Sequence, residues 1–127
     1  MEERFGELRV YQQAKKLTNE VYPATRKGVF SGDLGLLDQL RRAGVSVMSN
    51  IAEGFERDTR PEFIRVLFIA KGLSGEARAQ LEIAFDQQYL TNEDHPRIRK
   101  LAQETSGMLS NLISSIKSTA ATVKKKT

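Results

Sequence analysis

Residues 40–81 constrain the fold more than any other stretch, because apolar residues recur there at helical spacing on more than one face. Before a polar hinge at residues 54–61, positions three and four apart form an inward stripe: Leu37, Leu40, Gly44, Val47 and Ile51. After the hinge, a second stripe of the same spacing contains Phe63, Leu67, Ala70, Ser74, Ala77 and Leu81. This spacing is one face of a helix with about 3.6 residues per turn. The stretch therefore predicts two long helices joined by a short turn.

Both predicted helices carry more apolar surface than one packing partner covers. Beside the inward stripes lie Val45, Met48 and Ala52 before the hinge, and Ile64 and Phe68 after it. A helix that is apolar over so much of its circumference has to be covered on several sides. In a chain this short, the expected cover is another copy of the chain. We therefore predict a homo-oligomer with these five residues in its interface.

The remaining sequence adds two amphipathic helices and no convincing strand pattern. The predicted helices span residues of about 8–27, 33–54, 60–88 and 92–121, with a basic tail at 122–127. Asp33, Thr59 and Thr91 are suited to cap the last three helices. Pro23 is expected to loosen the end of the first helix and Gly28 to end it. The sequence thus predicts one all-α domain over residues 1–127, an antiparallel up-down four-helix bundle that oligomerises.

Three further residues have predicted structural roles. Phe30 is expected to plug the end of the bundle, since it is the large apolar side chain of a short connection. Gly72 and Gly75 lie within the third predicted helix, where each glycine costs about 1 kcal/mol relative to alanine. Close approach of another helix is the expected reason for both glycines.

Composition narrows the class of protein. Hydrophobic residues at 39% and charged residues at 28% are typical of a globular domain. The absence of cysteine excludes disulfides and thiolate metal sites, and fits a reducing compartment. No apolar run approaches the roughly 20 residues of a membrane-spanning helix, and the start at Glu2 and Glu3 is unlike a secretory signal. We expect a cytoplasmic protein without a membrane partner.

The net charge of +4 is unevenly distributed, with its excess on the first and last predicted helices. These helices are neighbours in an up-down bundle, so one basic face is expected. Such a face neutralises phosphates without reading sequence, and the lack of interleaved aromatics argues against base stacking. The competing interpretation is a face that is only solvated. The predicted nucleic-acid-binding residues are Arg9, Lys15, Lys16, Arg26, Lys27, Arg97, Arg99, Lys100 and Lys117, with residues 124–126 adding loosely.

No constellation for catalysis or metal binding is evident in the sequence. The single histidine, His95, precedes Pro96 at a helix start, no cysteine is present, and the Glu-x-x-His pairs of a di-iron bundle are missing. We therefore expect neither enzyme activity nor a cofactor. Paired glutamates for acid–base chemistry are a weaker interpretation than a polar network, in which Glu53 pairs with an arginine within the chain or between subunits. The predicted network is Arg41, Arg42, Asn50, Glu53 and Glu76.

Several motifs together resemble one bacterial family. They are Arg41-Arg42, the block Asn-Ile-Ala-Glu-Gly-Phe at residues 50–55, Pro61-Glu62-Phe63, Ile69-Ala70-Lys71-Gly72, Glu76 and Leu81. In combination they resemble a four-helix-bundle family that includes proteins encoded in intervening sequences of 23S rRNA and accessory variability determinants of diversity-generating retroelements. The resemblance runs from residue 8 to about residue 117 and implies a homopentamer. Where that family usually has Gly-Ser-Leu, this chain reads Gly-Leu-Ser at residues 72–74, so its serine lies one position later.

The residues and the resemblance leave two classes of function open. In the first, the protein is an RNA-binding oligomeric accessory protein. The favoured form of this class binds a retroelement reverse transcriptase and its template RNA, or mixed RNA and DNA, and the alternative form acts on 23S rRNA. In the second class, the protein is a scaffold whose basic surface binds an acidic protein and no nucleic acid.

Overall fold

The structure is a computed structural model that describes the backbone of residues 5–126 and the side chains of residues 5–6 and 8–119. Its elements are η1 (Phe5–Glu7), a 3-10 helix, and the α-helices α1 (Arg9–Thr25), α2 (Gly28–Ser31), α3 (Leu34–Phe55), α4 (Arg60–Asp86) and α5 (Asp94–Lys126). No strand occurs over residues 5–126, which confirms the predicted all-α class. Over the same residues, no helix is both long and apolar enough to cross a membrane.

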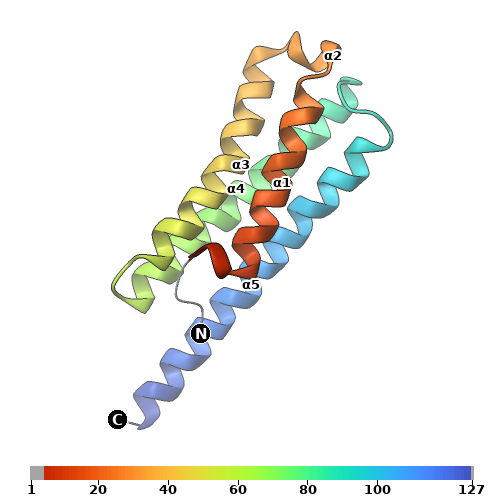
Figure 1. Ribbon diagram of the computed structural model, residues 1–127. Helices are drawn as coiled ribbons and strands as arrows, with labels where there is room; N and C mark the ends of the chain where they lie inside the picture. The colour runs from red at the N-terminus through yellow and green to blue at the C-terminus, as the bar shows by residue number, and fades with distance from the viewer. Residues whose placement is uncertain (1–4, 127) are drawn as a thin grey trace.

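The four long helices lie side by side, and consecutive ones run in opposite directions (Figure 1). α1 packs against α3 and α5, and α4 packs against the same two helices, so α1 and α4 lie diagonally across from each other. Of these four contacts, α3–α4 is the most densely packed and α1–α5 the most sparsely packed. α5 extends past the end of the other helices (Figure 1). The first and last long helices are therefore neighbours, as the predicted basic face requires.

The core consists of two clusters of buried apolar residues. The cluster near α2 contains Phe30, which is fully buried and plugs that end of the structure, as predicted. Its ring centroid lies 5.3 Å from that of Tyr89, in the connection between α4 and α5. The cluster near η1 contains Ile51, Leu67 and Leu109, all fully buried. Burial of each such side chain stabilises the fold by about 1.5–3 kcal/mol.

Small and hydroxyl-bearing residues lie between the two clusters. Ser74 Oγ of α4 donates to the carbonyl of Ala102 of α5 at 2.9 Å, and Ser106 Oγ donates to Ser74 Oγ at 2.9 Å. A Cβ added to Gly44 of α3 would lie 2.9 Å from Thr18 Oγ1 of α1. The α1–α3 hairpin and the α4–α5 hairpin are thus each held closely at mid-height.

The three predicted helix caps are present. Asp33 Oδ1 accepts a hydrogen bond from the backbone N–H of Leu36 at 3.1 Å, and Thr59 Oγ1 accepts one from that of Glu62 at 3.3 Å. Thr91 Oγ1 accepts from the N–H of the first residue of α5 at 2.9 Å. These side chains satisfy backbone donors that a helix start leaves without a partner. The predicted helix starts agree closely with the structure for this reason.

The end of α1 differs from the prediction. Gly28 does not end the helix, which stops at Thr25; instead Gly28 begins α2, after Lys27 adopts extended backbone angles. α1 also continues past Pro23, and in that last turn Thr25 Oγ1 donates to the carbonyl of Val21 at 2.9 Å. This side-chain hydrogen bond supports a turn in which proline lacks its own N–H.

The ends of α4 and α5 also differ from the prediction. α4 stops at Asp86, and Gln88 follows with a positive φ of 62°, which ends the helical path. α5 continues to Lys126, so residues 122–126 extend the helix instead of forming a separate tail. The side chains of this last part, and Thr127, lie outside the described residues.

The reason predicted for Gly72 and Gly75 is wrong within the chain. A Cβ at Gly72 would meet no atom within 4 Å, and one at Gly75 would lie 3.8 Å from Arg78 Nη2. The inward stripe of α4 passes through residues 70, 74 and 77, so position 72 points away from the core. Close approach occurs instead at Gly44 and at Gly54, where a Cβ would lie 2.9 Å from the ring of Phe63.

Candidate nucleic-acid interface

A polar stripe on α1 faces a matching stripe on α5. Their residues are three or four positions apart, which keeps them on one side of each helix. We call the two stripes, together with Lys27 and Asp94 near α2, the α1–α5 seam. Its α1 stripe is Arg9, Gln13, Lys16 and Glu20, and its α5 stripe is Arg97, Lys100, Glu104, Gly107 and Asn111.

Ion pairs close the seam at the end near α2. Asp94 is only 6% exposed; it pairs with Lys27 and, at 3.1 Å, with Arg97. Arg97 Nε also donates to Glu20 Oε1 of α1 at 2.7 Å. The hydrogen bond from Lys27 holds the pKa of Asp94 below its ordinary value, against the opposing effect of burial. Lys27 and Arg97, two predicted nucleic-acid ligands, therefore have partners inside the chain.

Three other cations of the seam have no ion-pair partner among the residues that the structure describes. Arg9, Lys16 and Lys100 are exposed. The carboxylate of Glu104 lies in the same seam, and it accepts a hydrogen bond from Gln13 Nε2 at 3.2 Å. These three positive charges are exposed along α1 and α5, where phosphates of a ligand can approach.

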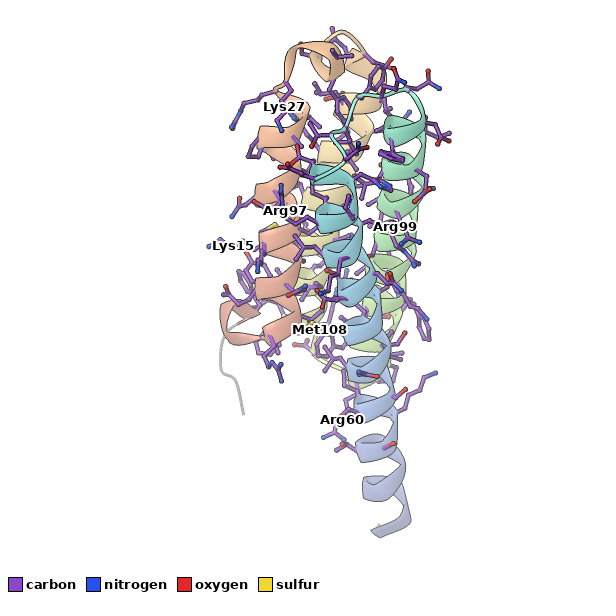
Figure 2. All side chains as sticks on the ribbon, turned by 90° about the vertical axis from the view of Figure 1, so that its right-hand side faces the viewer. Lys15, Lys27, Arg60, Arg97, Arg99 and Met108 are labelled. Carbon is purple, nitrogen blue, oxygen red and sulfur yellow. The ribbon has the colours of Figure 1, made fainter. Side chains whose placement is uncertain are left out.

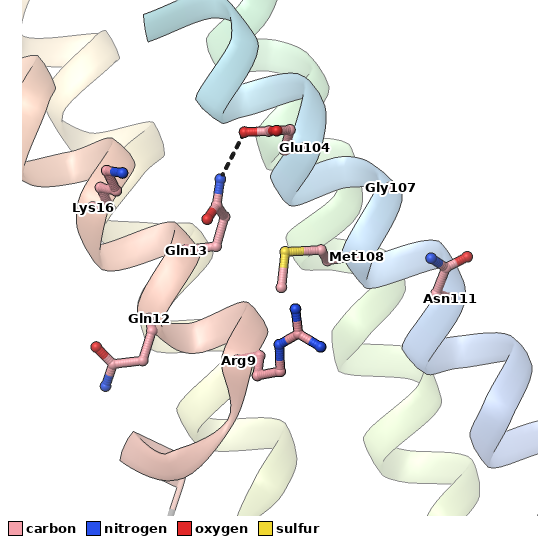
Figure 3. A pocket seen from close by; sticks show the side chains of 8 residues that line it. All are labelled: Arg9, Gln12, Gln13, Lys16, Glu104, Gly107, Met108 and Asn111. Carbon is pink, nitrogen blue, oxygen red and sulfur yellow. Dashed lines mark hydrogen bonds between the residues drawn. The ribbon is translucent and has the colours of Figure 1, made fainter.

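A groove of about 770 Å³ separates α1 from α5 in the half of the seam nearer η1. Figure 3 shows the guanidinium of Arg9 and the thioether of Met108 in the gap between the two helices, and Gln13 reaching across to Glu104. A hollow of about 350 Å³ that shares Arg9, Met108 and Asn111 continues the groove with apolar walls from Leu8, Val10 and Leu112. The lining of the larger groove is Arg9, Gln12, Gln13, Lys16, Glu104, Gly107, Met108 and Asn111.

The other predicted ligands lie on different faces. Figure 2 shows Lys15 on the outer side of α1 and Arg99 on the side of α5 toward α4. Arg99 Nε pairs with Glu82 Oε1 of α4 at 3.1 Å, and Lys117 Nζ lies 5.0 Å from the ring centroid of Phe68. The side chains of residues 124–126 lie outside the described part of the chain. The structure thus places Arg9, Lys16, Lys27, Arg97 and Lys100 along one seam and puts Lys15, Arg99 and Lys117 on other faces. Arg26 is exposed at the end of α1.

The predicted polar network does not form inside the chain. Glu53 lies about 17 Å along α3 from Arg42, because an α-helix rises about 1.5 Å per residue, and it pairs with Arg57 one turn away. Each remaining member also has a partner outside the predicted network. Arg41 Nε donates to Thr25 Oγ1 of α1 at 2.8 Å. The other three find partners one turn away on their own helices: Arg42 pairs with Asp38, Asn50 donates to the carbonyl of Ser46, and Glu76 accepts from Gln80. A network between subunits stays a prediction.

The residues predicted for the oligomer interface differ in exposure. Val45 is 41% and Phe68 46% exposed, whereas Met48 and Ile64 are partly buried against the cluster near η1. Ala52 is also partly buried. On α4, Ile69 beside Phe68 is exposed as well, and so is Ile83, about four turns further along the helix.

The described residues offer no metal centre, since no group of three His, Asp or Glu side chains is placed to hold an ion there. His95 stacks on Phe85 with ring centroids 4.0 Å apart, and its Nε2 lies 3.4 Å from Glu82 Oε1. What the seam supplies is positive charge, amide groups and an apolar hollow.

Sequence reasoning missed the uncharged lining of the groove. Gln12, Gln13 and Asn111 belong to no motif, and Met108 follows the apolar periodicity of the last helix, which predicts core and not groove. The role of Gly107 depends on which helix faces it. Helical periodicity identifies the exposed side of each helix. Only the placement of α1 against α5 shows that these residues share one groove.

Comparison with known proteins gives one family and one fold. A family model described as 23S rRNA-intervening sequence protein matches residues 6–111. Among solved structures, 5 chains match. One is a protein of unknown function from the S23 ribosomal protein family of Bacteroides thetaiotaomicron, which is 22% identical, with 82% of this chain and 97% of that chain covered and a TM-score of 0.75. At this identity the likeness shows the fold alone. No curated protein matches the chain.

Proposed function

This chain belongs to the 23S rRNA-intervening sequence protein family, and we propose that it is a non-enzymatic RNA-binding protein that contacts RNA through the α1–α5 seam. The observation that carries the proposal is the alignment of Arg9, Lys16 and Lys100, which are exposed and have no ion-pair partner among the described residues. A phosphate that meets a free cation releases its condensed counterions, which favours binding in low salt. The proposed contact is therefore mostly with the RNA backbone.

The proposed assembly is a homo-oligomer of up-down four-helix bundles in the cytoplasm. The exposed apolar side chains of Val45 and Phe68 support self-association, and the family resemblance implies five subunits. Each copy would add another seam to the same particle. Several seams that engage one RNA raise the overall affinity without any new kind of contact.

The family description favours rRNA over retroelement RNA as the context of this binding. A reverse transcriptase partner therefore stays a prediction from the resemblance. The alternative class, a scaffold for an acidic protein, rests on the same basic residues. The two classes of function are distinguished by measuring the affinity of the protein for RNA and for an acidic polypeptide at several salt concentrations. A phosphate-binding site predicts that the affinity for RNA falls more steeply with salt.

The proposal is tested by titrating a labelled, structured fragment of 23S rRNA at two salt concentrations. The parent is compared with a Lys16→Glu/Lys100→Glu variant, which reverses two charges of the seam. We expect the parent to bind at low salt, and the variant to bind more weakly with a shallower slope of log affinity against log salt. The oligomeric state of both proteins is measured in parallel.

The matched control compares two single variants, Lys16→Glu and Lys71→Glu. Lys71 is an exposed lysine of α4 with no ion-pair partner among the described residues, and α4 lies diagonally across from α1. Both changes alter the net charge equally, so only a local site distinguishes them. Equal losses of affinity would show that general charge, and not the seam, governs binding. Absence of binding by the parent at low salt would overturn the proposed function.

A further inference from the structure

α5 carries a glycine at position 107 that nothing in the described part of the chain requires. Gly107 is exposed, its φ is not positive, and an added Cβ would meet no atom within 4 Å. Glycine in a helix interior destabilises the helix relative to alanine. Its missing side chain leaves the wall of the α1–α5 groove open at this level.

The residues around this opening offer the contacts that an unstacked nucleotide needs. The guanidinium of Arg9 and the thioether of Met108 both project into the gap (Figure 3). Unpaired RNA bases stack on guanidinium planes and pack against flat or apolar side chains. Lys16 provides a positive charge for the phosphate, and the hydrogen-bonded Gln13 and Glu104 side chains present polar atoms to a base edge.

The size of the groove is suited to one nucleotide. Its volume of about 770 Å³ falls within the range of about 300–1,000 Å³ that is common for small-molecule sites. The adjoining hollow, lined by Leu8 and Leu112, adds an apolar surface against which a base can pack. A base inside a duplex cannot enter, because its faces are covered by its neighbours. An unpaired base in a bulge or loop can be turned outward.

We infer that the groove binds one unpaired nucleotide of a structured RNA, with its base between Arg9 and Met108 and its phosphate at Lys16. This inference rests on the proposed function and adds a ligand class to it. The seam binds the RNA backbone, and the groove selects RNA that has a bulged or looped nucleotide. Selection therefore depends on shape and on one accessible base, and not on a long sequence.

The test uses two labelled RNA hairpins that differ by a single bulged nucleotide in the stem. We expect the parent to bind the bulged hairpin about tenfold more tightly at fixed salt, as one stacked base allows. Gly107→Leu fills the groove without changing charge, and the free space at Gly107 lets the fold accept the new side chain. This variant should bind the uninterrupted stem like the parent and lose the preference for the bulge.

Gln103→Leu is the matched control. Gln103 is exposed one turn earlier on α5 and does not line the groove, so the preference for the bulge should persist. Equal binding of both hairpins by the parent would overturn the inference and leave the seam proposal standing. A preference that survives in Gly107→Leu would also overturn it. Failure of the parent to bind either hairpin would overturn the proposed function itself.

Discussion

Replacing Asp94 with asparagine would remove the carboxylate that joins α1 to α5 at the end of the seam near α2. That carboxylate is almost fully buried and accepts from Lys27 and Arg97. A hydrogen bond to a charged group stabilises a protein by about 1.5–3 kcal/mol. The two partner side chains are 51% and 49% exposed, so water can solvate them again when the carboxylate is lost. We therefore expect a loss of about 2 kcal/mol for the two contacts together.

The effect of this substitution should depend on pH with a definite sign. The pKa of Asp94 is lowered in the folded state, chiefly by the hydrogen bond from Lys27. The unfolded state, with an ordinary aspartate pKa of about 3.9, therefore takes up the proton first as pH falls. The stabilisation by Asp94 is full above that value and is lost as pH falls through the folded pKa. The difference between parent and variant should be constant from pH 7 to about pH 5 and narrow at lower pH.

The assay is thermal and urea unfolding followed by circular dichroism, at one protein concentration and one ionic strength. For a chain of this length, a loss of about 2 kcal/mol lowers Tm by about 7 °C. Glu93→Gln is the matched control, because Glu93 is exposed and has no ion-pair partner among the described residues. Equal stability of Asp94→Asn and the parent at pH 7 would refute the reasoning. So would a difference that stays unchanged down to pH 3.

Two further predictions concern glycines and the exposed face of α4. Gly44→Ala should destabilise the fold by about 1–2 kcal/mol in urea unfolding, because the new Cβ meets Thr18. Gly107→Ala should stabilise the fold by about 0.5–1 kcal/mol. Changes of the same sign in the free energy of unfolding would contradict the packing described. Phe68→Glu should dissociate the proposed oligomer and keep the helical content, since the ring is 46% exposed within one chain; light scattering that finds a folded parent monomer would exclude the oligomer.

Local signals predicted most of the fold, because they act within one helix turn. Asp33 and Thr59 cap the helices that follow them. The inward stripes correspond to buried residues apart from Phe63, which is partly buried. The basic face was predictable in outline from charge and helix order. Its division between faces was predictable only in part. Lys15 and Lys16 point about 100° apart on any α-helix, but which of them faces α5 depends on how α1 packs against α5.

The predicted network failed because it joined residues by type and not by distance along a helix. Glu53 and Arg42 lie on one helix but several turns apart, and each finds a partner of its own one turn away. The groove required the placement of α1 against α5, which no residue pattern encodes alone. Gly107 illustrates the difference, since its only visible sequence signal was a glycine within a predicted helix.

Of the four contacts between long helices, the one between α1 and α5 is the most sparsely packed. Hydroxyl and glycine contacts hold α1 to α3 and α4 to α5 at mid-height, while the contact between α1 and α5 relies largely on polar side chains. An RNA that spans the seam would bind only the closed arrangement. By mass action it would then stabilise the folded state in proportion to the logarithm of its free concentration. Because the RNA would contact both α1 and α5, it would hold together the most sparsely packed pair of helices. The free energy of unfolding would therefore rise with the amount of RNA bound.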